Sequence, residues 1–208
     1  MIRSVPRHVI CRNAIRHEAD EDMNRVNREA FVARFGGVYE HSPWVAERTH
    51  DSGALPGFLS EIDRDPAGEL RSSAEADALA SVLAATLASA DDAAKLALIR
   101  AHPDLVGAAA LAGALTDDST AEQSSAGLDR CTSEELDRFR KANAAYRERF
   151  GFPFVLAVRG ADRPAILAAF EHRLGNDEST EWHTALAEID RIARFRLEAF
   201  VGSRPDSA

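Results

Sequence analysis

Helix start and stop signals recur along this chain and constrain its fold more than any other sequence feature. Thr132-Ser133-Glu134-Glu135 is a capping box, and the stretch that follows it runs to Phe150 and stops at Gly151. Signals of this kind are typical of α-helices joined by short loops. Together they predict helices over residues 27–35, 43–49, 74–88, 91–102, 132–150, 162–174 and 181–201.

Proline determines one predicted boundary in each of two of these helices. Ser42 is predicted to cap the helix that Pro43 opens. His102 is predicted to end another, because the residue before Pro103 disfavours helical backbone. Residues 152–158 form an apolar, partly β-branched run, but a single strand has no partner here, so we expect an extended segment threading between helices. The sequence therefore predicts a single-domain, all-α bundle of about eight or nine helices, rich in alanine.

Composition limits the class of protein. The chain has 208 residues, enough for one domain with a substantial core. Its 34 acidic and 25 basic residues leave a net charge of −9, which argues against a nucleic-acid partner because phosphate binding needs a basic face. No run approaches the roughly 20 apolar residues of a membrane helix. Cys11 and Cys131 supply neither a disulfide framework nor a four-thiolate zinc site, so we expect a reducing, cytoplasmic location.

The first 22 residues differ in composition from the rest. Four arginines precede any acidic residue and no apolar segment follows, which argues against a secretory signal. An organellar transit peptide and an upstream translation start ahead of Met23 are the two alternatives, and the lack of a Ser-rich amphipathic pattern favours the second. We therefore expect a domain over residues 23–202, between an N-terminal extension (1–22) and a polar tail (203–208).

The segment His102-Pro103-Asp104-Leu105 places an imidazole where a helix must end. The last turn of a helix carries partial negative charge, which is expected to raise the pKa of His102 towards neutrality. Such a histidine can exchange protons at physiological pH. The alternative is a histidine that only bonds the last carbonyls of the helix.

Residues 119–123 combine hydroxyls, a carboxylate and a carboxamide. Ser119 and Glu122 have the spacing of a second capping box, in which Glu122 would only bond the Ser119 amide. A helix N-terminus also offers free N–H groups and a positive dipole end, which suit an anionic or carbonyl-rich ligand. Gln123 adds a carboxamide complementary to urea-like groups. This stretch is therefore a candidate binding site as well as a candidate cap.

Arg159 follows the apolar run 152–158. Its planar guanidinium suits a substrate carboxylate, while the alternative is an arginine at the end of an extended segment that reaches solvent.

Metal and nucleotide signals are weak. No glycine-rich phosphate loop is present, and Cys131 has no activating neighbour in sequence. Residues 40–44 are expected to pack and cap around Trp44. Four histidines with carboxylates nearby lack the spacing of a zinc site: His41, His50, His172 and His183.

Four blocks of sequence, residues 35–44, 102–105, 119–128 and 150–160, closely resemble the OHCU decarboxylases in content and order. These are the 2-oxo-4-hydroxy-4-carboxy-5-ureidoimidazoline decarboxylases of urate breakdown, and the resemblance covers about residues 23–202. It implies an all-α fold and catalytic roles for His102, Glu122 and Arg159. It also implies that the substrate contacts Pro103, Ser119, Thr120, Ala121, Gln123, Phe154, Val155, Leu156, Ala157 and Val158.

The substrate of that family carries its carboxylate beside a ring imine, which takes the electrons released with carbon dioxide, so we expect no cofactor. Arg159 and the backbone of residues 119–123 would orient the substrate. His102, held by Glu122 or acting beside it, would take the hydroxyl proton and protonate the enol carbon from one face, yielding (S)-allantoin. Which of His102 and Glu122 delivers the last proton stays open. We expect a homodimer with no nucleic-acid or membrane partner.

Two other functions fit the same residues. A cofactor-free hydrolase of a related ureide would use His102 and Glu122 to activate water. A non-enzymatic, acidic helical binding module would use both residues only as caps, so their substitution would change stability without any loss of activity.

Removal of residues 1–22 is predicted to leave folding and activity intact, because this segment lacks a core-forming pattern. The melting temperature and the decarboxylation rate of the truncated protein test the prediction. A large drop in melting temperature would show that the segment packs against the domain.

Overall fold

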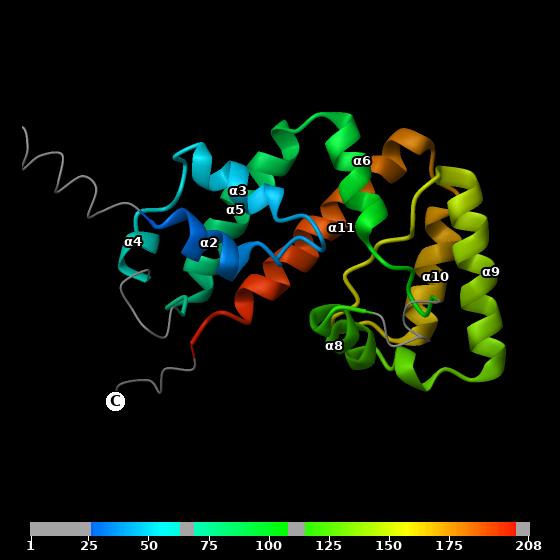
Figure 1. The fold of residues 1–208 in the computed structure, drawn as a ribbon. Coiled ribbons are helices and arrows are strands. Elements are labelled where there is room, and N and C mark those ends of the chain that lie inside the picture. The colour runs from blue at the N-terminus through cyan, green and yellow to red at the C-terminus, as the bar shows by residue number, and fades with distance from the viewer. Residues whose placement is uncertain (1–25, 63–68, 108–114, 203–208) are drawn as a thin grey trace, which may run out of the picture.

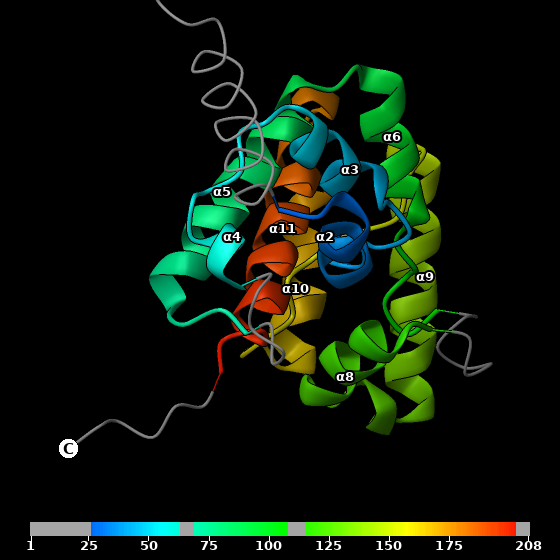
Figure 2. The ribbon, with the colours of Figure 1, turned by 60° about the vertical axis from the view of Figure 1, so that its left-hand side comes forward.

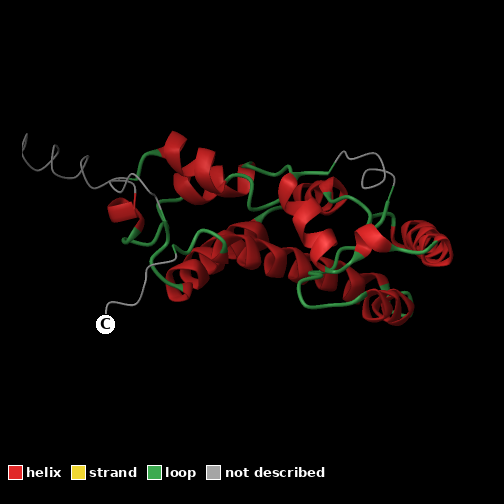
Figure 3. Cartoon of the chain, turned by 90° about the horizontal axis from the view of Figure 1, so that it is seen from below, coloured by secondary structure: helices red, strands yellow, loops and turns green. Residues whose placement is uncertain are grey.

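The computed structural model describes residues 26–62, 69–107 and 115–202, and its regular elements are helical throughout these ranges (Figures 1 and 3). The predicted all-α class is therefore confirmed, while the predicted extension (1–22) and tail (203–208) both lie outside the described residues. An isolated bridge joins Leu70 to Val201. No helix in the described ranges is both long and apolar enough to cross a bilayer. The elements are α2 (Arg28–Phe35), α3 (Trp44–Asp51), α4 (Leu59–Ile62), α5 (Ser73–Ser89), α6 (Asp92–Ala101), α8 (Asp117–Ser125), the 3-10 turn η1 (Leu128–Arg130), α9 (Ser133–Phe150), α10 (Arg163–Arg173) and α11 (Glu178–Glu198).

Side-chain caps fix several helix ends where the sequence predicts them. The capping box of Thr132 and Glu135 opens α9, and Gly151 closes it in the left-handed conformation with φ 73°. Asp91 opens α6 by accepting a hydrogen bond from the Ala94 amide at 2.8 Å, and α6 ends at His102.

The predicted starts of α3 and α11 are wrong. Ser42 does not cap α3, which begins at Trp44 with Pro43 at the cap position and no side-chain capping bond. α11 begins three residues before the predicted 181, because Asp177 accepts a hydrogen bond from the Thr180 amide at 2.8 Å and provides an earlier cap. α11 also ends before the predicted glycine stop.

α11 is the helix against which the others are arranged. It runs from the side of α9 and α10 toward the side of α2 to α5 (Figures 1 and 2), and it packs along α5 and contacts α6. Ala185, Ile189 and Ala193 are buried at helical spacing and define its core face. A charged residue, Arg196, is also buried on this helix.

Aromatic side chains fill the space between α9, α10 and the segment after α9. The rings of Phe154 and Phe170 stack with centroids 3.7 Å apart, and Tyr146 meets Phe154 edge-on at 5.1 Å. Phe154 belongs to residues 153–158, which form neither helix nor strand. This segment is therefore anchored between helices by its side chains.

A buried ion pair holds the backbone of the same segment. Arg173 donates through Nε to Glu181 Oε1 at 2.8 Å and through Nη1 to the Val155 carbonyl at 2.6 Å. Tyr146 donates its hydroxyl to Glu181, and Asn176 donates to the second Glu181 oxygen at 2.7 Å. Burial, reinforced by the bond to Glu181, raises the pKa of Tyr146 and keeps it a donor. The charges of Arg173 and Glu181 thus compensate each other inside the core.

Glu181→Ala is predicted to lower the free energy of unfolding by about 3–5 kcal/mol, because it leaves the Arg173 charge buried without its partner. The matched control is Asp77→Ala, which removes the exposed partner of Arg194 at 2.6 Å and should change stability by about 1 kcal/mol at most. Denaturant unfolding of both variants measures the difference. Equal effects would contradict a structural role for the buried pair.

Candidate active site

Residues from four parts of the chain meet at one small cavity of about 30 Å³, room for about one or two water molecules. They come from the end of α6 and the turn after it, from α8, from segment 153–158, and from α11. The lining residues are His102, Pro103, Leu105, Ser119, Glu122, Gln123, Phe154, Val155, Leu156, Val158, Ile192 and Arg196. Four residues of the predicted set do not line this cavity: Thr120, Ala121, Ala157 and Arg159.

His102 is buried, and its ring is oriented by the helix that it ends. Nδ1 lies 3.0 Å from the Leu98 carbonyl, which can only accept, so a neutral ring carries its proton on Nδ1 and leaves Nε2 as an acceptor. Nε2 has no hydrogen-bond partner within the described ranges. Burial lowers the pKa of His102, and the bond to Leu98 and the nearby Glu40 charge offset only part of that effect. The expectation of a raised pKa is therefore wrong, because burial outweighs the helix terminus.

The turn after His102 is tightly constrained. Val106 has a left-handed backbone with φ 54°, a costly conformation for a β-branched residue. Its amide donates to Gln123 Oε1 at 3.0 Å, and Asn143 donates to the Leu105 carbonyl at 2.8 Å. A side chain at Gly107 would approach Asp104 Cβ to 2.6 Å. The side-chain oxygen of Gln123 thus already accepts a hydrogen bond within the protein, and only its side-chain N–H groups are left for a ligand.

The predicted capping box at Ser119 is wrong. Thr116 caps α8 by accepting from the Ser119 amide at 3.2 Å, so the helix begins at Asp117. The Thr120 amide already bonds the Thr116 carbonyl at 2.9 Å. Thr116 is the earlier cap, and it places Glu122 inside the helix with its carboxylate free for other partners. This stretch therefore faces the cavity with side chains rather than with a helix N-terminus.

Arg196 joins two carboxylates that are distant in sequence. Its Nε donates to Glu122 Oε1 at 2.9 Å, and its Nη2 donates to Glu40 Oε2 at 2.6 Å. Glu40 also accepts hydrogen bonds from the hydroxyls of Thr116 and Ser119, each at 2.7 Å. Burial alone would raise the pKa of Glu40, but these hydroxyls and Arg196 outweigh it and lower the pKa. Glu40 is therefore held as an anion, and it is connected to the cavity through Arg196 and Ser119, which line it.

Sequence reasoning missed Arg196 and Glu40. It assigned residues 40–44 to packing around Trp44, whereas Glu40 is buried and bonded to the site. A signal was present in α11, where Arg196 follows Ile189, Ile192 and Ala193 at the spacing of a buried helix face. A charge at such a position requires a carboxylate partner.

Arg159 lies outside the cavity lining. It donates to Glu198 Oε2 and to the Phe195 carbonyl, both at 2.9 Å, and its guanidinium lies 4.4 Å from the centroid of the Phe195 ring. Its side chain is 48% exposed. The structure thus brings His102 and Glu122 to one cavity. Arg159 does not line that cavity, and its side chain is instead bonded to residues of α11.

Two side chains hold the backbone of segment 153–158 in place. The Val155 carbonyl accepts from Arg173, and the Ala157 amide donates to Glu188 Oε2 at 2.8 Å. These two bonds fix the segment while Phe154, Leu156 and neighbouring residues line the cavity.

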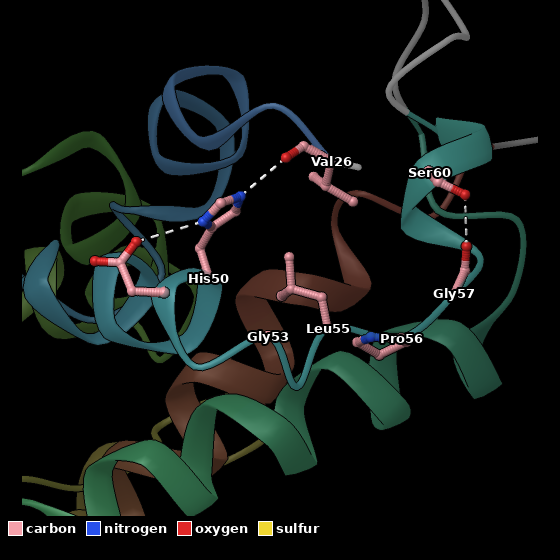
Figure 4. Close-up of a pocket in the computed structure, with 8 residues that line it drawn as sticks. Val26, His50, Gly53, Leu55, Pro56, Gly57 and Ser60 are labelled. Carbon is pink, nitrogen blue, oxygen red and sulfur yellow. Dashed lines mark hydrogen bonds and ion pairs between the residues drawn. The ribbon is translucent and has the colours of Figure 1, made fainter. Parts of the chain in front are cut away.

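A larger hollow of about 560 Å³ lies between the end of α3 and α4 (Figure 4). His50 there bonds the Val26 carbonyl at 2.9 Å, and Asp51 pairs with Arg28 at 2.7 Å. Its polar groups already have partners, so size alone does not make it the functional site. Across the ranges that the structure describes, no cluster of three or more His, Cys, Asp or Glu side chains could hold a metal ion.

Comparison with known proteins identifies the family. A sequence model of the OHCU decarboxylase family matches residues 24–198. The chain is 41% identical over 177 residues to a 2-oxo-4-hydroxy-4-carboxy-5-ureidoimidazoline decarboxylase of Haloferax volcanii, covering 85% of this chain and 92% of that one. It is 34% identical to the uric acid degradation bifunctional protein PucL of Bacillus subtilis, covering 90% of this chain and 33% of that protein.

Solved structures share the fold. A crystal structure of (S)-allantoin synthase aligns with a TM-score of 0.60 at 29% identity, over 87% of this chain and 53% of that chain. A crystal structure of OHCU decarboxylase in the presence of (S)-allantoin aligns with a TM-score of 0.51 at 20% identity, over 68% of this chain and 90% of that chain. The family match and the H. volcanii relative confirm the resemblance seen in the sequence, and the chain belongs to the OHCU decarboxylase family.

Proposed function

We propose that this chain decarboxylates 2-oxo-4-hydroxy-4-carboxy-5-ureidoimidazoline to (S)-allantoin in urate degradation, without a cofactor. The observation that carries the proposal is a single cavity that brings a buried imidazole, bonded at Nδ1 to a backbone carbonyl, together with a guanidinium paired with a carboxylate. The activity named for the H. volcanii relative supports the choice of substrate.

The reaction needs positioned charges and a proton path. The bond between the ring carbon and the carboxylate breaks, and its electron pair forms a carbon–carbon double bond as the imine nitrogen accepts electrons and a proton. The substrate hydroxyl then loses its proton to become a carbonyl, and the ureido-bearing carbon gains one. Because the ring imine is the electron sink, the protein has to supply orientation and proton transfer only.

His102 suits the role of base for the substrate hydroxyl. Its Nε2 is the accepting nitrogen because Nδ1 donates to Leu98, and the lowered pKa of His102 keeps the ring uncharged at neutral pH. Once protonated by the hydroxyl, His102 can return that proton to the ureido-bearing carbon. A histidine fixed on one side of the cavity would protonate that carbon from one face, as (S)-allantoin requires.

Arg196 takes the role of carboxylate ligand that the sequence suggested for Arg159. Arg196 lines the cavity and is buried, whereas Arg159 is half-exposed and bonded to Glu198. Ser119, the amide of Gln123 and the segment from Phe154 to Val158 would contact the ureido group and ring.

The proposal includes a cytoplasmic homodimer. The two cysteines suit a reducing compartment. Analytical ultracentrifugation decides the oligomeric state.

The purified protein is predicted to accelerate formation of dextrorotatory allantoin from substrate generated in situ by urate oxidase and hydroxyisourate hydrolase. Chelators should leave the rate unchanged, and a loss that a divalent metal restores would contradict the proposal.

His102→Asn should lower kcat by on the order of 10² or more, with a near-normal melting temperature because asparagine can still donate to Leu98. Wild-type kcat, measured at saturating substrate, should decline as pH falls below about 6.5, because burial lowers the pKa of His102 and preserves the base form down to that pH.

Arg196→Lys is predicted to raise KM on the order of tenfold or more, because an ammonium cannot reproduce a bidentate fork. The matched control is Arg159→Lys, which alters an arginine outside the cavity lining and should stay near the wild-type KM. Steady-state kinetics of both variants, with melting temperatures alongside, make the comparison. A larger loss in Arg159→Lys would return the carboxylate role to Arg159.

A further inference from the structure

Glu40 and Glu122 share one guanidinium but are held very differently. The Glu40 side chain is 1% exposed and accepts from two hydroxyls as well as from Arg196. The Glu122 side chain is 24% exposed, and its carboxylate bonds only Arg196 within the described ranges, at 2.9 and 3.0 Å. Arg196 is thus anchored by Glu40, while its bonds to Glu122 can be exchanged at lower cost.

The cavity cannot hold the substrate in this arrangement. Its volume of about 30 Å³ is that of one or two water molecules, whereas the substrate has a ring, a ureido group and a carboxylate. His102, Glu40 and Arg196 are all buried. Glu122 is the charged group of the site with the most freedom to move aside.

The charges around Arg196 favour protonation of one carboxylate when the substrate binds. Among the described residues, Arg196 and His102 are the titratable groups that line the cavity with Glu122 from other elements. Glu40 shares Arg196 with Glu122, and the exposed His41 lies 4.0 Å from Glu40. Asp117 and Asp118, on α8 itself, are exposed. With His102 uncharged, one guanidinium already faces two carboxylates, which leaves a net charge of −1, and the substrate carboxylate adds a third negative charge. Three carboxylates around one guanidinium strongly favour protonation of one of them.

We propose that the substrate carboxylate replaces Glu122 on Arg196, and that the displaced Glu122 takes up one proton from solvent. This inference rests on the proposed function. Loss of carbon dioxide from the carboxylate form consumes one proton per turnover, and Glu122 supplies it to the imine nitrogen that receives the electron pair. The hydroxyl proton passes separately through His102 to the ureido-bearing carbon. The product lacks the carboxylate, so ionised Glu122 returns to Arg196.

The pH dependence of KM and kcat tests the exchange in the wild type, Glu122→Gln and Asp117→Asn. Wild-type KM should rise with pH, by up to about tenfold per pH unit, because binding takes up a proton. Glu122→Gln should have a KM that is independent of pH and no higher than wild type, with kcat lowered on the order of 10². Asp117→Asn, which removes an exposed charge from the same helix, should retain the wild-type profile.

A raised and still pH-dependent KM in Glu122→Gln would overturn the exchange and make Glu122 a fixed clamp on Arg196. A wild-type KM that does not change with pH would overturn it as well, while leaving the decarboxylase function standing. If the wild type does not turn the substrate over, calorimetry in buffers of different ionisation enthalpy decides. Wild-type protein should then take up one proton with 2-oxoimidazolidine-4-carboxylate and none with imidazolidin-2-one, and absence of uptake with the carboxylate counts against the exchange.

Discussion

A guanidinium buried on α11, the longest of the described helices, needs carboxylates, and Arg196 obtains them from two distant parts of the chain. Glu40 comes from the loop between α2 and α3, and Glu122 comes from α8. A buried charge without a partner costs several kcal/mol, so the N-terminal helices and α8 have to meet α11 at this point. Arg196 and Glu122 also line the cavity, so assembly of the site and packing of the helices depend on the same contacts.

Arg173 applies the same principle to the other side of the cavity. Its charge is balanced by Glu181, which leaves Nη1 to bind the Val155 carbonyl. Glu188 on α11 accepts the Ala157 amide. A lone extended segment has no neighbouring strand to bond its backbone, and buried backbone groups require partners. Side chains of α10 and α11 take the place of that strand.

Most of the fold could be predicted from local signals, because caps such as Asp91 and the Thr132 box act within a few residues of the helix they start. The start of α8 was mispredicted because Thr116 and Ser119 are both acceptable caps and only the packed structure selects between them.

The partners of Arg196 lie 74 and 156 residues away in sequence, beyond the reach of any local pattern. The sequence suggested a ligand role for Arg159 because this residue ends an apolar run, but in the structure its guanidinium donates hydrogen bonds to Glu198 and to the Phe195 carbonyl on α11. The pKa of His102 likewise depends on burial by residues that the sequence alone does not bring near.

The left-handed backbone of Val106 ties the stability of the protein to the geometry of its base. A conformation of this kind costs about 1–3 kcal/mol for a residue other than glycine, and here the bond from its amide to Gln123 maintains it. Glycine at this position would relieve that cost, but it would also remove a valine side chain that is 3% exposed in the core and widen the range of shapes open to the turn that carries His102. The packing of the Val106 side chain therefore offsets the strain of its backbone and also restricts the turn before which the imidazole lies, so loss of this side chain would lower thermal stability and loosen the placement of the base together.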